Sequence, residues 1–188
     1  MGNLFQPGYL PAQALAGQVF IGATAAAGVT LPAHNGTAQT FGIWNPLGSG
    51  VEVVITALDI GIATATTPVV GSFGFSWLAN AGSQVAGSAA ITAFTKATPV
   101  NARLGLGNPS KVYFTPSGAT ITAPTFLFPI GLSFATTTAS NGVQWYHNDF
   151  NGDWTIPPGN YVGLGCSAAQ SGTVTQVGMR WLELPFNG

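Results

Sequence analysis

The fold class is decided by the stretch Phe126-Leu127-Phe128-Pro129-Ile130-Gly131-Leu132-Ser133-Phe134, in which a large apolar side chain occupies every second position. A β-strand sends successive side chains to opposite faces, so a period of two predicts a strand with one apolar face. Proline has no amide hydrogen to donate to a neighbouring strand. Pro129 therefore predicts an edge strand, or a bulge at that position.

The same alternation recurs elsewhere, in Phe73, Phe75 and Trp77 and again in Val177, Met179 and Trp181. Clusters of turn-forming residues separate such stretches, at 45–50, 80–83, 108–110, 116–118, 141–142 and 157–160. The 26 Gly and 13 Pro disfavour helices. We therefore expect an all-β, jelly-roll-like antiparallel β-sandwich, with roughly eight to ten strands between residues 37 and 184.

The stretch from Val51 to Ile62 is apolar on both faces, apart from Glu52, Thr56 and Asp59. It could be a strand that is covered on both sides or a buried helix. Its many β-branched residues favour the strand. A strand of this kind needs cover on its outer face, and a neighbouring subunit could supply that cover.

The chain before residue 34 has a different character, without regular alternation. Residues 12–16 could form a helical turn at most, and residues 18–21 resemble a strand. Two interpretations stay open for residues 1–33. They form an extended N-terminal arm that docks on a neighbour through Phe5, Tyr9 and Leu10, or a loose leader followed by the first strand. Residues 34–188 then form the jelly-roll sandwich domain.

Charged side chains are scarce, because the chain has only 4 Lys and Arg, 5 Asp and Glu, and a net charge of -1. They make up 5% of the residues, against about 25% in an average soluble domain. Such a chain can build neither a basic patch for nucleic acid nor a polybasic membrane anchor. A surface with so little charge resists association poorly. We expect sister subunits or a larger particle to cover much of it.

Residues that could carry catalysis are few. His34 and His147 are the only histidines, and no serine stands in a G-x-S-x-G sequence. The single Cys166 alternates with Val162 and Leu164, which predicts a buried thiol rather than a nucleophile. The histidines and the cysteine are too dispersed to form a zinc ligand set. The sequence therefore predicts a protein without enzymatic activity, metal or cofactor.

The segment from Trp145 to Trp154 is the most suggestive one for binding, because it combines aromatic, amide, imidazole and carboxylate groups. It could be a surface loop, held by Asx turns and pinned in the core by its two tryptophans. It could also bind a cell-surface glycan, because sugars stack on aromatic faces and hydrogen bond to such polar groups. The candidate carbohydrate-binding residues are Trp145, Tyr146, Asn148, Asp149, Asp153 and Trp154.

A turn of the type aromatic-Asn-Pro-x-Gly-Ser-Gly, at 44–50, leads into the apolar stretch that begins at Val51. Ile156-Pro157-Pro158-Gly159 and the final Met179–Pro185 complete the pattern. In these features, most of the chain after about Gly17 resembles the jelly-roll virion proteins of tailed bacteriophages. The resemblance implies a homotrimeric structural protein, made in the host cytoplasm and placed on the virion surface. Its partners would be capsid or tail proteins, as a decorating protein, spike or fibre.

Overall fold

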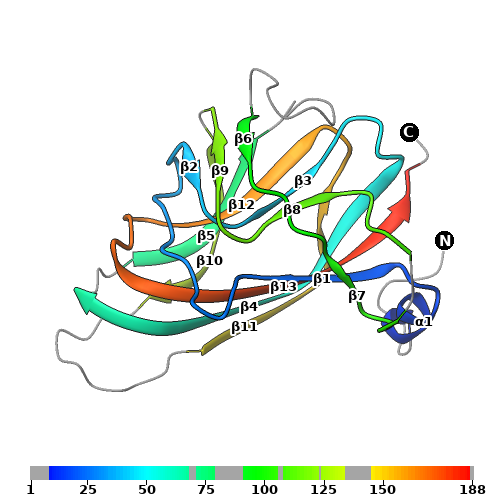
Figure 1. Ribbon diagram of the computed structural model, residues 1–188, viewed down its shortest axis with the longest axis horizontal. Helices are drawn as coiled ribbons and strands as arrows, with labels where there is room; N and C mark the ends of the chain where they lie inside the picture. The colour runs from blue at the N-terminus through cyan, green and yellow to red at the C-terminus, as the bar shows by residue number, and fades with distance from the viewer. Residues whose placement is uncertain are drawn as a thin grey trace.

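The computed structural model describes residues 9–67, 71–78, 91–105, 108–122, 124–133 and 145–186, and its strands form three antiparallel sheets (Figure 1). Sheet A has the order β11-β4-β13-β1-β7, from β1 (Val19–Ala23), β4 (Val51–Thr67), β7 (Val100–Asn101), β11 (Trp145–Ile156) and β13 (Gly172–Pro185). Sheet B has the order β10-β5-β12-β3-β8, from β3 (Gly42–Asn45), β5 (Gly71–Leu78), β8 (Tyr113–Thr115), β10 (Thr125–Ser133) and β12 (Asn160–Cys166). The small sheet C has the order β2-β9-β6, from β2 (Ala38–Gln39), β6 (Ile91–Phe94) and β9 (Ala119–Ile121).

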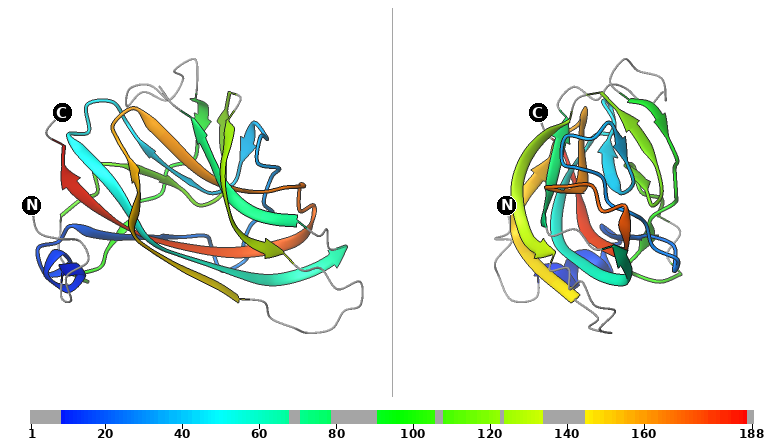
Figure 2. Two further views of the ribbon diagram at one scale, coloured as in Figure 1. Left: turned by 180° about the vertical axis from the view of Figure 1, so that it is seen from behind. Right: turned by 90° about the vertical axis from the view of Figure 1, so that its left-hand side faces the viewer.

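The principal strands alternate between the two large sheets as the chain advances. The series β3, β4, β5 and the series β10, β11, β12, β13 change sheet at every step. This places the run β1-β13-β4-β11 in one layer and the run β3-β12-β5-β10 in the other (Figure 2). Interleaving of this kind is the pattern of a jelly roll. The expected all-β, jelly-roll-like antiparallel sandwich is confirmed.

The main core lies between sheets A and B. The alternating residues that the sequence singled out supply much of it, because Phe73, Phe75, Val177, Met179 and Trp181 are all buried there. Burying a large apolar side chain contributes about 1.5–3 kcal/mol, so these stripes hold the two layers together. A second cluster joins sheet B to sheet C around Trp44 and Tyr161. Trp77, the third member of its stripe, is instead partly exposed.

The stretch that begins at Val51 is the long strand β4, so the helix alternative is wrong. Its cover at Val54 comes from the chain itself. A helix, α1 (Tyr9–Leu15), places Leu10 and Ala14 on the same face, one turn apart, and both pack against the cluster of Val19, Val54 and Leu182. At this position no neighbouring subunit is required. The helix is also longer than the single turn expected at 12–16.

The N-terminal segment joins the sandwich from Val19 onwards. Strand β1 pairs with β13, from Val19 opposite Leu182 to Ala23 opposite Gly178. Two isolated bridges follow along the chain, one from Val29 to Thr175 of β13 and one from Ala33 to Cys166 of β12 in sheet B. Residues 19–23 are therefore the first strand of sheet A, as the second interpretation had it. Of the proposed arm anchors, Phe5 and the side chain of Tyr9 lie outside the described residues, and Leu10 packs on its own chain.

Pro129 lies in an edge strand and beside a bulge, as expected of a residue without an amide hydrogen. Strand β10 is an edge strand of sheet B, and its pairing with β5 shifts register between Phe126 and Phe128 and again between Pro129 and Gly131. These irregularities interrupt the expected alternation, and the consecutive side chains Phe126, Leu127 and Phe128 are all exposed. The single apolar face expected of this stretch is therefore absent at its beginning, where apolar side chains face solvent instead.

Candidate functional site: a groove between strands β10 and β11

Residues 145–156 form the edge strand β11 of sheet A, so the prediction of a loop was wrong. The strand pairs with β4, and its register is interrupted between Asp149 and Trp154. Within the interruption, Asn151 has a φ of 50° and Gly152 a φ of 86°. Asn and Gly are the residues that adopt this left-handed backbone most readily. The turn-like composition that suggested a loop thus belongs to a bulge within a long strand.

Two edge strands meet at this side of the sandwich. β11 ends sheet A and β10 ends sheet B, and their side chains bridge the two layers. The amide Nδ2 of Asn148 donates a hydrogen bond to the carbonyl oxygen of Ile130 over 2.8 Å. The rings of Trp154 and Phe128 lie 5.3 Å apart. Two hollows lie beside these strands, and residues of both β10 and β11 line each of them. We call the two hollows together the β10–β11 groove, and Trp154 lines both parts.

The first part of the groove is a polar hollow of about 370 Å³. It is lined by Phe128, Pro129, Ile130, Asn148, Asp149, Phe150, Asp153 and Trp154. Four of the six residues that the sequence nominated for carbohydrate binding are therefore brought together here. They come from one strand, and the opposite wall belongs to β10, which the sequence did not connect with them.

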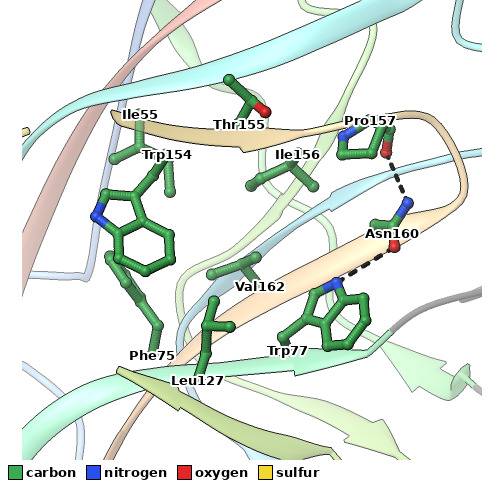
Figure 3. A pocket seen from close by; sticks show the side chains of 10 residues that line it. All are labelled: Ile55, Phe75, Trp77, Leu127, Trp154, Thr155, Ile156, Pro157, Asn160 and Val162. Atoms are coloured by element: carbon green, nitrogen blue, oxygen red, sulfur yellow. Dashed lines mark hydrogen bonds between the residues drawn. The ribbon is translucent and has the colours of Figure 1, made fainter. Parts of the chain in front are cut away.

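The second part is an aromatic hollow of about 270 Å³ (Figure 3). It is lined by Ile55, Phe75, Trp77, Leu127, Trp154, Thr155, Ile156, Pro157, Asn160 and Val162. Figure 3 shows Trp154 and Trp77 on opposite sides of the hollow. The indole Nε1 of Trp77 donates to Oδ1 of Asn160 over 3.2 Å, and Nδ2 of Asn160 donates in turn to the carbonyl oxygens of Pro157 and Pro158. This chain of bonds fixes the orientation of the Trp77 ring.

The sequence missed Trp77, Leu127, Phe128 and Asn160 as members of this site. Trp77 belongs to an alternating series whose other members, Phe73 and Phe75, are buried in the core. Phe128 belongs to a stretch whose alternation predicts one apolar strand face. A partial signal existed in Pro129, which marks an edge strand. The sequence did not show that this edge lies beside β11.

Trp145 and Tyr146 lie outside the groove. Trp145 is 60% exposed, and its ring lies on the outer face of sheet A over Gly61, its partner on β4. It therefore does not pin the segment in the core. Tyr146 points the other way and packs edge-on against Phe73, with ring centroids 5.5 Å apart. The two residues support the strand rather than line the hollow.

A charged network occupies the outer face of β11. Nδ1 of His147 lies 2.7 Å from Oδ1 of Asp59, and Nε2 lies 3.2 Å from Oδ2 of Asp149. Arg180 pairs with the same Asp149 over 3.5 Å. The hydrogen bond with Asp59, followed by that with Asp149, raises the pKa of His147 above its ordinary 6.5. Both imidazole nitrogens are thus engaged, and the described part of the chain holds no cluster of His, Cys, Asp or Glu that suits a metal ion.

The other two candidates for reactivity are buried. Cys166 is a free, buried thiol, which confirms the prediction, and its sulfur accepts a hydrogen bond from Nε2 of Gln170. His34 is buried beside Phe126, with ring centroids 4.4 Å apart. Burial lowers the pKa of His34, so the imidazole is neutral at physiological pH. Both residues serve the packing of sheet B.

Comparison with protein-family models finds no match for this chain, and comparisons with curated proteins and with solved structures find none either. Across the described ranges, no helix combines the length and the hydropathy needed to cross a bilayer.

Proposed function

We propose that this chain is a non-enzymatic structural protein of a bacteriophage virion. It forms a homotrimer that decorates or stabilises the capsid, or builds a spike or fibre, through contacts with capsid or tail proteins. The jelly-roll-like topology agrees with the family that the sequence resembles. The scarcity of charge over 188 residues supports a surface made for contact with other proteins.

The motif that carries the resemblance has a structural role in the fold. Asn45 lies buried at the end of β3, and its Nδ2 donates to the carbonyl oxygens of Val51 and Ile156, each over 2.8 Å. Gly48 and Gly50 have φ values of 84° and 71°, which glycine adopts without strain. The motif thus ties the turn between β3 and β4 to the end of β11. A motif of this kind specifies architecture, which is what a structural protein requires.

The observation that carries the proposal is an apolar patch at the free edge of sheet A. Val100 of the short edge strand β7 pairs with Ile21 of β1, so the two side chains share a face. Arg103 donates from Nη1 to the carbonyl oxygen of Leu15, which brings the end of α1 to the same place. These neighbouring segments carry four exposed apolar side chains, which we call the β7 edge patch: Leu15, Ile21, Val100 and Leu104.

A patch of this composition gains free energy when a partner covers it. Burying one such aliphatic side chain contributes about 1.5–3 kcal/mol, whereas forming a complex costs roughly 4–15 kcal/mol in lost freedom. Four such side chains contribute about 6–12 kcal/mol at most, which is comparable with that cost, so a stable assembly also needs contacts around the patch. The edge position suits this, because β7 presents unpaired backbone groups to a neighbouring chain.

Electron cryo-microscopy of virions isolated from cells that produce the chain tests this proposal. We expect threefold density for the sandwich on the capsid or tail, with Val100 and Leu104 at a contact between copies. Density that shows single copies, with the β7 edge patch facing solvent, would reject the trimer. Particles whose surface lacks the chain altogether would reject the virion role.

A further inference from the structure

We infer that the β10–β11 groove binds a neutral saccharide of at least two sugar units, which lies across Trp154. This binding function goes beyond the structural role proposed above and does not depend on it. The groove is on the edge of the sandwich formed by β10 and β11, whereas the β7 edge patch belongs to the opposite edge strand of sheet A.

The aromatic residues of the groove offer stacking faces. Phe128 is 48% exposed and Trp77 is 38% exposed, although both are large apolar side chains. Trp77 is held in place by Asn160, so its ring is oriented before a ligand arrives. The C–H face of a pyranose ring packs on such a surface, because it is flat and apolar while its edges carry hydroxyl groups.

Hydrogen-bond acceptors for the hydroxyl groups of a sugar also line the groove. Asp153 follows the bulge and lines the polar hollow, and no group within the described part of the chain donates a hydrogen bond to its carboxylate. Asn148 also lines this hollow, and since its Nδ2 donates to Ile130, its amide oxygen remains as an acceptor. Sugar hydroxyls are donors that both groups can accept.

The combination of aromatic faces with a carboxylate acceptor favours a saccharide over an apolar peptide. A purely apolar occupant would remove the Asp153 carboxylate from water without giving it a donor, which is costly. A saccharide covers the aromatic faces and supplies donors at the same time. This is the chemical reason for preferring one occupant of the groove.

The charges of the groove select a neutral saccharide. Among the described residues that line the two hollows, Asp149 and Asp153 carry charge, and the lining includes no lysine or arginine. Arg180 and His147 both pair with Asp149, on the outer face of the sheet. An acidic sugar would bring a further carboxylate close to Asp153, whereas the nearby cations Arg180 and His147 are already paired with Asp149.

The size of the groove sets the length of the ligand. The two hollows measure about 370 and 270 Å³ and share Trp154 as a common wall. Small-molecule sites typically span about 300–1,000 Å³, so the larger hollow is at the small end of that range and the smaller one is just below it. A ligand with one sugar unit on each side of Trp154 uses both hollows.

The experiment uses the full chain on an array of neutral oligosaccharides, followed by calorimetry with lactose, chitotriose and cellotriose at millimolar concentration. 3′-Sialyllactose is the acidic probe matched to lactose. We expect at least one neutral saccharide to bind. Trp77→Ala should weaken its binding at least about tenfold, as loss of a central aromatic contact does. Asp153→Asn should weaken it about fivefold, because an amide is a poorer acceptor than a carboxylate.

Trp145→Ala is the matched control, because it removes the same residue type from β11 on the face away from the groove. We expect it to bind as the unaltered chain does, and near-ultraviolet circular dichroism establishes that each variant is folded. The inference is overturned if no neutral saccharide binds, if the sialylated probe binds as tightly as lactose, or if Trp145→Ala weakens binding as much as Trp77→Ala. It also fails if Trp77→Ala changes only the mass of the assembly, since the groove is then a subunit contact.

Discussion

Nδ1 of His147 lies 2.7 Å from Oδ1 of Asp59, and the two residues are direct partners across the β4–β11 pair. Asp149 approaches the other ring nitrogen and is itself paired with Arg180. The imidazole therefore lies between two carboxylates, which favour its protonated form. The network links the edge strand that carries the groove to the middle of sheet A.

We predict that the pKa of His147, measured by NMR titration of its ring protons, is above 6.5 and falls toward that value in Asp59→Asn. Because the folded state raises the pKa, the imidazole contributes stability below pH 6.5 and loses that contribution as pH rises through the folded pKa. His147 is exposed, so the effect on unfolding is small. An unchanged pKa in Asp59→Asn would show that the pair does not persist in solution.

A second prediction compares two strand glycines. A Cβ added at Gly42 of β3 would lie 2.7 Å from the backbone carbonyl oxygen of Val162, which cannot move without shifting β12. Gly42→Ala should therefore lower the free energy of unfolding by about 1–3 kcal/mol.

Gly61→Ala is the matched control, because the added Cβ would meet only the exposed ring of Trp145, at 2.8 Å. That side chain can turn away, so the loss should be less than about 1 kcal/mol. Urea unfolding of both variants measures the difference. Equal losses would mean that β3 and β12 are not packed as closely as described.

A third prediction concerns Glu183, whose carboxylate accepts hydrogen bonds from Ser110, the backbone N–H of Lys111 and Trp181. Burial raises the pKa of Glu183 above its ordinary 4.5, although these donors oppose the change. Removal of one donor in Ser110→Ala should raise that pKa further.

The direction in which pH changes the stability follows from the coupling between proton binding and folding. A carboxyl with a raised pKa favours the folded state below pH 4.5, and this contribution is lost as pH rises through the folded pKa. Ser110→Ala should thus destabilise the fold more at pH 7 than at pH 4, by thermal unfolding at both values. The same loss at both pH values would show that Ser110 does not stabilise the ionised carboxylate.

The sequence allowed the fold class to be predicted because its period-two stripes are local. Val177, Met179 and Trp181 enter the core as their spacing indicates, and Pro129 marks both an edge and a bulge. The strand at Val51 was favoured by its β-branched residues, which fit a pleated surface. These features depend on neighbours within the same strand.

The groove could not be predicted, because it depends on contacts between strands that are distant in the chain. Phe128 and Trp154 belong to different sheets, and only the strand order places them together. Asn151 and Gly152 suggested a loop although they form a bulge within a strand, because loops and bulges both use these residues where the backbone is left-handed. The cover of Val54 by Leu10 was equally non-local.

A fourth prediction tests the β7 edge patch. Leu104 is 80% exposed within the patch, and Leu47 is also exposed but lies in the turn between β3 and β4. Leu104→Glu places a charge at the proposed contact and should shift the assembly toward monomer at least about tenfold in dissociation constant. Leu47→Glu adds the same charge elsewhere and should leave the assembly intact. If both variants associate equally well, the patch does not form the contact.

The most direct test is the mass of the unaltered chain in solution, by size-exclusion chromatography with light scattering at micromolar concentration. A homotrimer predicts three times the 19.1 kDa of a single chain. A stable monomer of 19.1 kDa would contradict the account, because water would then cover the sparsely charged surface and the β7 edge patch.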